Sequence, residues 1–286
     1  MKNSIFTLNA GKVKKVFAAA IVGVMTMGLI SCGATKDSAA EKDMLDVIKE
    51  NGKLVVGLSA DYAPYEFYIK EDGELKLVGF DIDLANEIAK DLGVELETKE
   101  MEFDALVTAL PANKIDVVIS GMNPDETRKK AIDFSDIYYV SEHGILTRAE
   151  DKDKYKTFAD LEGKKVGAQL GSTQEAIATE KIPNADMQLL ASVNDLILEL
   201  KTGKVDALII EVPVAEMAVK ANPDLAVAEE RFKDETGGNA VGIKKGSPKL
   251  VEEINKTIKR LVDDGTMDKF IINATSIADK QVEIEE

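Results

Sequence analysis

The stretch KIDVVISGMNPDETRKKAIDFSDIYY, residues 114–139, decides the fold. It opens with a β-branched apolar run at 115–119, which predicts a short strand buried on both faces. Asn123 and Pro124 are typical of a helix start, with Asn as the cap and Pro as the first helical residue. A buried strand followed by a turn and a helix indicates an α/β sheet, whose ligands bind beyond the carboxyl ends of the strands.

Three groups follow the 115–119 strand and are able to converge on one anion: the Ser120 hydroxyl, the amides near Gly121 and the Arg128 guanidinium. The chain has four arginines among its 36 basic residues. Only the planar fork of Arg binds a carboxylate through two parallel hydrogen bonds, which Lys cannot reproduce. The alternative is a surface arginine at the end of a short helix.

The composition fits a globular protein of one large or two medium domains, with 286 residues, 45% hydrophobic and 31% charged. The net charge is −16, and residues 1–31 hold four lysines and no acid, so the remainder carries −16 − 4 = −20. Such a charge excludes nucleic acid as a partner. A single Cys and a single His, His143, exclude an internal disulfide and the usual zinc and iron–sulfur sets. We expect no metal, no cofactor and a structural His143.

The N-terminal segment indicates a lipoprotein signal. Three lysines between residues 12 and 15 precede an apolar run at 16–30, which is too short for a comfortable membrane span. The run ends in Leu-Ile-Ser-Cys-Gly at 29–33, which resembles a bacterial lipobox. We expect a signal peptide at 1–31, lipid (palmitate-type) attachment at Cys32 and a tether at 32–43, with an ordinary signal peptide or an anchor helix as the alternative. The folded part would then be lipid-anchored on the outer face of the bacterial cytoplasmic membrane.

Residues 54–119 predict a βαβαβ unit, and therefore a parallel sheet with right-handed crossovers. The expected strands are 54–58, 94–98 and 115–119. The first helix starts near Asp81 and ends at Gly93, and the second is capped by Asp104. Glu71-Asp72-Gly73, between the first strand and the first helix, is a hairpin-type turn signal.

A second α/β unit follows. It comprises a strand at 164–168, a helix opened by the capping box Ser172-Thr173-Gln174-Glu175, a helix from 194 or 195 to 200 and a strand at 205–210. The last third predicts a strand at 240–243, a long helix from Ser247-Pro248 to 262 stopped by Gly265, and a short helix at 267–272.

The two units share a pattern of helix, tight turn, Lys, apolar residue, Asp and strand. LPANKIDVVI at 110–119 parallels LKTGKVDALI at 200–209, ninety residues later. Ser120 follows the first strand and Glu211 follows the second. Two similar lobes that each present polar residues from an equivalent strand predict a ligand cleft between them.

Several motifs in order resemble the extracytoplasmic solute-binding proteins of polar-amino-acid ABC importers, the bacterial solute-binding protein family 3. The resemblance covers residues 54 to 270 and rests on LVGFDIDL at 77–84, FDAL at 103–106, KID at 114–116, Arg128 with DFSD at 133–136, and LEGKKVG at 161–167. It implies a two-lobed periplasmic-binding-protein-like α/β fold, each lobe a mostly parallel sheet flanked by helices, joined by two hinge strands. The implied boundaries are 44–142 plus 238–286 for lobe one and 143–237 for lobe two, with crossovers near His143 and Gly237.

The resemblance also implies the site. Arg128 would bind the ligand carboxylate with support from Ser120, Asn123 and Thr173, and Glu211 would pair with the α-ammonium. Tyr62 and Phe103 would sandwich the ligand side chain, and Asp81 would meet a cationic one. The full implied ligand-binding set is Ser59, Tyr62, Asp81, Phe103, Ser120, Gly121, Met122, Asn123, Arg128, Gln169, Ser172, Thr173, Gln174 and Glu211.

Each of these residues has a structural alternative. Tyr62 and Phe103 suit a core, Asp81 suits a helix N-cap, and Glu211 before Val212-Pro213 suits a first-turn acid. The chain also departs from the family pattern at two positions. Asp125 stands where relatives often carry Thr, and Ser59 stands where some binders of basic amino acids carry Asp.

The resemblance implies a monomeric binding protein that is not an enzyme. It would capture a polar amino acid and deliver it to the permease and ATPase subunits of an ABC importer. Arginine or lysine is the expected ligand, with glutamine as the neutral alternative that Ser59 favours. A lyase or dehydratase of the same fold, with Glu211 as general acid, is the rival from another class. A receptor sensor domain is a third hypothesis, disfavoured because no membrane span follows residue 270 in the sequence.

Overall fold

The computed structural model describes residues 42–285, with side chains as far as Asp279. The expected signal peptide, the lipid-attachment Cys32 and nearly all of the tether lie outside the described residues. Among residues 42–285, no helix combines the length and the apolar character that a bilayer crossing requires.

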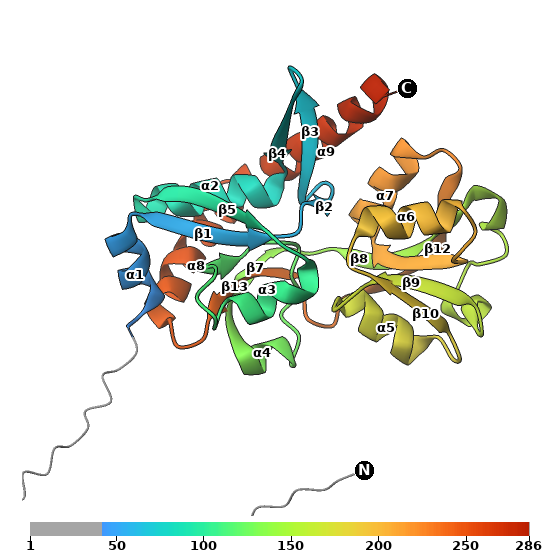
Figure 1. Cartoon of the computed structure of the whole chain (residues 1–286), viewed down its shortest axis with the longest axis horizontal. Helices are drawn as coiled ribbons and strands as arrows, with labels where there is room; N and C mark the ends of the chain where they lie inside the picture. The colour runs from blue at the N-terminus through green and yellow to red at the C-terminus, as the bar shows by residue number, and fades with distance from the viewer. Residues whose placement is uncertain (1–41, 286) are drawn as a thin grey trace, which may run out of the picture. The chain divides into compact units, whose positions relative to one another are not determined.

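The first five-stranded sheet has the order β5-β1-β6-β13-β7 (Figure 1). Strands of the predicted βαβαβ unit pair in parallel, β1 with β5 and with β6, and β13 and β7 complete the sheet in antiparallel pairs. We call this sheet and its helices lobe one. Its elements are α1 (Met44–Asn51), β1 (Lys53–Leu58), α2 (Phe80–Leu92), β5 (Glu95–Glu100), α3 (Phe103–Ala109), β6 (Val117–Val118), α4 (Arg128–Ala131), β7 (Ile132–Tyr139), β13 (Asn239–Lys244), α8 (Pro248–Asp263) and α9 (Thr266–Glu285).

A small three-stranded sheet adjoins lobe one, formed by β2 (Asp61–Tyr62), β3 (Glu66–Glu71) and β4 (Glu74–Val78). The β3–β4 hairpin turns at Asp72-Gly73, as its turn signal predicted.

The second five-stranded sheet, which we call lobe two with its helices, has the order β10-β9-β11-β8-β12. Its elements are β8 (Glu142–Arg148), β9 (Lys165–Gln169), α5 (Thr173–Lys181), β10 (Asp186–Leu190), α6 (Val193–Lys201), β11 (Ala207–Glu211), α7 (Val212–Ala221) and β12 (Leu225–Lys233), with two single-turn 3-10 helices at Ala149–Asp151 and Phe158–Leu161.

The two sheets have the same layout, because β6 and β11 both lie third and both pair in parallel on one side and antiparallel on the other. The repeated aspartate has the same task in each lobe. Asp116 accepts a hydrogen bond from the Val55 amide (2.8 Å), and Asp206 accepts one from the Lys165 amide (3.1 Å). The chain passes from the first sheet to the second between Tyr139 and Glu142, and it returns between Lys233 and Asn239.

Alternating side chains of β11 explain why helices cover both faces of the second sheet. Leu208 and Ile210 pack with residues of α6 and α7, while Ala207 and Ile209 pack against Ala178 of α5. A strand was predicted at 205–210, and the structure confirms it, with β11 buried on both faces.

Three predicted boundaries are wrong. The helix expected to begin at Asn123-Pro124 begins at Arg128, because the Asp125 carboxylate bonds the amides of Thr127 and Arg128 and shapes a turn there. Glu102 precedes the helix that Asp104 was expected to cap. The last helix continues to Glu285, since its later turns pack against α2 and α7.

Gly79 fixes the start of α2 against the turn that carries Tyr65 and Glu66. Its φ is 134° and its ψ is 163°, a conformation essentially confined to glycine. A Cβ there would lie 2.0 Å from the Tyr65 carbonyl oxygen. The same turn accepts the amides of Phe80 and Asp81 through the carbonyls of Pro64 and Tyr65.

Gly79→Ala should therefore lower the free energy of unfolding by about 3 kcal/mol or more. Gly93→Ala is the matched control at the other end of α2, where φ is 71° and nothing lies within 4 Å of the added Cβ. That control should cost about 1 kcal/mol. Urea unfolding of both variants checks this, and equal losses would contradict the proposed clash with Tyr65.

Candidate functional site

A small cavity lies between the lobes at the carboxyl ends of β1, β6 and β9. It is lined by Ser59, Tyr62, Glu66, Phe103, Ser120, Gly121, Asn123, Gln169 and Gln174. All but Glu66 belong to the set that the sequence predicted. The cavity measures about 10 Å³, which is room for roughly one water molecule. A larger molecule enters only if the lobes separate or side chains move.

The lobes touch around this cavity, so the structure has a closed arrangement. Arg128 Nη2 of lobe one donates to the Gly171 carbonyl of lobe two (2.9 Å). Asn123 Nδ2 donates to Asp234 of the returning crossover (2.6 Å). The Tyr65 hydroxyl of lobe one donates to Glu211 at the end of β11.

Arg128 is buried beside the cavity without lining it. Its Nη1 donates to the Asn123 carbonyl (2.7 Å), its Nε lies 3.2 Å from an Asp125 oxygen, and its guanidinium carbon lies 5.3 Å from the centre of the Phe103 ring. Burial lowers the pKa of Arg128, and the charge of Asp125 opposes that shift. Since a guanidinium has five N–H groups, these contacts and the Gly171 bond leave two for another acceptor.

Glu66 and Asp81 form a buried carboxyl pair next to the cavity. Glu66 lines the cavity, and its Oε1 accepts from the Ser120 hydroxyl (2.5 Å). Asp81 lies behind it, where its Oδ2 accepts from the Gly121 amide (2.8 Å) and the Tyr138 hydroxyl (3.0 Å). Both side chains are fully buried. Asp81 neither caps α2 nor lines the cavity.

The other two oxygens of the pair, Glu66 Oε2 and Asp81 Oδ1, have no hydrogen-bond partner among the described residues. Burial raises the pKa of Glu66 well above its usual range, and the Asp81 charge raises it further. Burial also raises the pKa of Asp81, to about 7, against the bonds from Gly121 and Tyr138. A proton held between the two carboxyls satisfies both free oxygens, as expected for like charges that share one site.

Glu211 is also fully buried, and the side chains that donate hydrogen bonds to it lie outside the sheet and helices of lobe two. Beyond Tyr65, it accepts from the Ser141 hydroxyl (2.7 Å) and from Asn239 Nδ2 (3.2 Å). The carboxylate therefore ties lobe two to the first crossover and to β13. It does not line the cavity.

The two expected aromatic rings, Tyr62 and Phe103, both line the cavity. Gln174 extends from α5 toward Tyr62. Its Nε2 lies 3.5 Å from the Tyr62 hydroxyl and 3.1 Å from Nδ1 of His143. His143 is buried in β8. Gln169 donates to the Ala191 carbonyl (3.0 Å).

The remaining expected residues lie near the cavity but do not line it. Met122 is buried in the apolar cluster around Phe103. Ser172 caps α5 by accepting from the Glu175 amide (3.1 Å), as its capping box predicted. The Thr173 hydroxyl is buried and has no hydrogen-bond partner in the described part of the chain. Within residues 42–285, no cluster of His, Cys, Asp or Glu is suited to a metal ion.

Glu66 is the cavity residue that sequence reasoning missed. The Asp-Gly turn at 72–73 signalled a hairpin, and its first strand begins at Glu66, immediately after the loop that carries Tyr62. The pairing of β2 with β3, Tyr62 opposite Glu66, brings both side chains to the cavity. An acidic residue at the start of a hairpin strand, directly after an aromatic loop, was the available signal.

Comparison with known proteins gives the same architecture. The chain is 36% identical over 262 residues to the arginine-binding extracellular protein ArtP of Bacillus subtilis, covering 90% of this chain and 96% of ArtP. It is 33% identical to the L-cystine-binding protein TcyJ of Escherichia coli, over 87% and 91% of the two chains. It also resembles the solved amino-acid ABC transporter substrate-binding protein AbpA of Streptococcus pneumoniae bound to L-arginine, with a TM-score of 0.79, 42% identity, and coverage of 82% and 98%.

Residues 54–273 match the family described as bacterial extracellular solute-binding proteins, family 3. That match spans both sheets, both crossovers and every residue that lines the cavity. All three relatives are named as binding proteins, and AbpA as the substrate-binding protein of an ABC transporter. The chain is therefore a solute-binding protein and not an enzyme, and the lyase or dehydratase hypothesis is wrong. The chain belongs to family 3 of the bacterial extracellular solute-binding proteins.

Proposed function

We propose that this protein captures an arginine-like L-amino acid between its lobes and delivers it to the permease of an ABC importer. The observation that carries the proposal is Glu66, a buried carboxylate that lines the interlobe cavity with one oxygen lacking a donor among the described residues. A buried carboxylate without a cation costs free energy, and a guanidinium or ammonium supplies both charge and donors.

The cationic end of the ligand would lie at Glu66, between the rings of Tyr62 and Phe103. A flat guanidinium suits this place because each ring face attracts a cation by about 0.5–2 kcal/mol. Asp81, one layer behind, adds negative charge to the same site. The sequence had assigned the cation to Asp81, and we now assign that contact to Glu66.

The carboxylate end would lie at Arg128, whose two remaining N–H groups suit a bidentate contact. The Asn123 side chain and the unpartnered Thr173 hydroxyl would add hydrogen bonds from both lobes. The Ser120 hydroxyl would donate to the ligand only by releasing Glu66. Glu211 would pair with the α-ammonium, and to do so it must release Tyr65 or Ser141 as the ligand enters. Contacts from both lobes explain how a ligand favours closure, since they form together only in the closed arrangement.

Among the candidate ligands we favour arginine. Two of the relatives described above, ArtP and AbpA, are named for or bound to arginine, while TcyJ binds cystine. Ser59, where a second acid would strengthen a cation site, favours a neutral amide such as glutamine. Glu66 partly replaces that missing second acid, because Glu66 and Ser59 line the same cavity.

We further propose lobe boundaries at 44–142 plus 238–286 and at 143–237, and a monomer that hands its ligand to a permease and its ATPase. The family is extracellular, and Cys32 within its lipobox-like sequence supports attachment to the outer face of the cytoplasmic membrane through lipid. Metabolic labelling with palmitate, compared between wild type and Cys32→Ser, tests that attachment.

The function itself is tested by denaturing the purified protein, identifying any released small molecule by mass spectrometry, and then titrating the refolded protein by calorimetry. Arginine, lysine, glutamine and cystine form the panel. We expect arginine to bind most tightly. Tightest binding of glutamine or cystine would overturn the assignment of the ligand, and binding of none of them would overturn the amino-acid-binding function.

Replacing Arg128 tests the carboxylate end. Arg128→Ala should weaken every amino-acid ligand by about 3–5 kcal/mol, two to three and a half decades in Kd, because a buried charged partner is lost. Arg128→Lys should recover little, since the fork is absent. Calorimetry measures both, and a variant that binds within a few-fold of wild type would contradict the assignment.

Replacing Glu66 tests the cationic end separately. Glu66→Gln should weaken arginine about 10- to 100-fold, the value of a charge-assisted hydrogen bond, and leave glutamine within a few-fold of its wild-type affinity. Glu71→Gln, at the exposed end of the same strand, is the control and should change neither. Parallel losses for arginine and glutamine would mean that Glu66 does not contact the ligand side chain.

Arginine affinity should also depend on pH. In the free protein the raised pKa values of Glu66 and Asp81 keep a proton on the pair at neutral pH, and a bound guanidinium favours its release. Affinity should therefore rise as the pH increases toward the pKa of Asp81, about 7, by up to roughly tenfold per pH unit for one released proton. Calorimetry in buffers of different ionisation enthalpy should detect that proton. Affinity that is flat, or that rises toward low pH, would contradict the model of a protonated pair.

A further inference from the structure

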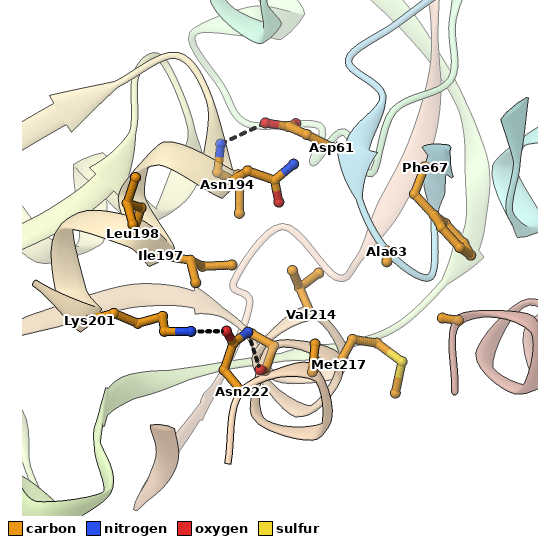
Figure 2. Close-up of a pocket in the computed structure, with 14 residues that line it drawn as sticks. Asp61, Ala63, Phe67, Asn194, Ile197, Leu198, Lys201, Val214, Met217 and Asn222 are labelled. Carbon is orange, nitrogen blue, oxygen red and sulfur yellow. Dashed lines mark hydrogen bonds between the residues drawn. The ribbon is translucent and has the colours of Figure 1, made fainter. Parts of the chain in front are cut away.

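A further polar contact joins the lobes, on the side of the Tyr62 loop that faces away from the ligand cavity. The Asp61 carboxylate of β2, in lobe one, accepts a hydrogen bond from the Val193 amide of lobe two at 2.6 Å (Figure 2). Val193 is the first residue of α6, whose N-terminal amides carry a partial positive charge. Asp61 therefore caps a helix of the opposite lobe.

The caps of α6 are divided between the two lobes. Ser192, the residue that precedes the helix, accepts from the Asp195 amide (3.2 Å) and satisfies the third helical position. Its hydroxyl does not reach the first position, which Asp61 occupies from across the interface. Separation of the lobes leaves the Val193 amide to water.

Asp61 and Tyr62 are adjacent in a strand, so their side chains point to opposite sides. Tyr62 lines the ligand cavity, while Asp61 lines a separate cavity of about 370 Å³ between β2, α6 and α7. A ligand that packs against Tyr62 fixes the same two-residue strand that positions Asp61. Capture and the cross-lobe cap are thereby linked through the backbone.

Among the described residues, apolar packing beside this contact is confined to one small cluster, in which Met217 of α7 joins Phe67 and Ile69 of β3 and Ala278 of α9. The walls of the larger cavity are mostly apolar and face one another across open space, with Phe67 and Ala63 on one side and Ile197 and Val214 on the other (Figure 2). Farther along, Lys220 of α7 pairs with Asp279 of α9 at 2.8 Å, but both side chains are substantially exposed, and such pairs contribute little. Neither the apolar cluster nor this ion pair supplies an acceptor for the Val193 amide, so neither replaces the Asp61 bond.

We propose that Asp61 is a positioning residue for ligand capture, which holds the lobes closed by capping α6 across the interface without touching the ligand. The inference rests on the proposed function. Because the bond forms only when the lobes are closed, it should slow the release of ligand and leave the rate of association nearly unchanged. Because it does not contact the ligand, it should act equally on every ligand that closes the protein.

The test compares Asp61→Ala, Asp61→Asn and Asp195→Ala with wild type. Asp61→Ala should weaken arginine and lysine by the same factor, about 3- to 30-fold as for loss of a helix cap, through faster dissociation in stopped-flow measurements. Asp61→Asn keeps an oxygen for the Val193 amide and should recover most of the affinity. Asp195→Ala removes an exposed acid from the same helix end without a cross-lobe contact and should bind as wild type.

Small-angle scattering of the ligand-free and arginine-saturated proteins adds a readout of closure. Asp61→Ala should need more arginine than wild type to reach the compact radius of gyration. Unchanged dissociation in Asp61→Ala, or unequal losses for arginine and lysine, would overturn the role of Asp61. If wild type binds no amino acid, the proposed function is wrong, but the cap can still be tested without ligand. The ligand-free Asp61→Ala variant should then have a larger radius of gyration than ligand-free wild type. An equal radius in that comparison overturns it.

Discussion

The structure depends on the burial of two carboxyl groups side by side. Glu66 and Asp81 come from a hairpin strand and from the first turn of α2, and Gly79 allows those segments to meet closely enough for Asp81 to bond the Tyr65 carbonyl through its amide. Gly121, Tyr138 and Ser120 supply donors to one oxygen of each carboxyl. The other two oxygens have no donor among the described side chains and share one proton, so the pair keeps a net negative charge. The guanidinium of the proposed ligand would satisfy one of those oxygens.

The two lobes have the same sheet layout, which explains why the Glu66–Asp81 pair beside Ser120 faces the equivalent strand end of the other lobe, at Glu211. The two sheets have the same order, and the carboxyl ends of β6 and β11 present Ser120 and Glu211 toward the interface. The chemistry of the two ends differs, since Ser120 belongs to the Glu66 network whereas Glu211 is held by Tyr65, Ser141 and Asn239. Closure brings both networks together. Asp61 adds a contact to closure that is independent of the ligand's own groups.

Local sequence signals predicted the elements that local physics determines. The apolar strands, the glycine that ends α2 and the Ser172 cap were found because each depends on residues close in the chain. The helix start at Asn123 was wrong because the Asp125 side chain competes for the same amides. Glu66 was missed, and Asp81 was given its role, because only the pairing of β2 with β3 decides which acid reaches the cavity. The cap of α6 by Asp61 lies equally beyond sequence reasoning, since it joins residues 132 positions apart.

A crystal structure of the protein with arginine tests the central claim most directly. We expect the guanidinium to lie between Tyr62 and Phe103, within hydrogen-bond distance of Glu66, while the α-carboxylate lies on the Arg128 fork. A guanidinium that points to solvent, or an α-carboxylate bound away from Arg128 with Glu66 still bonded to Ser120 alone, would contradict that claim.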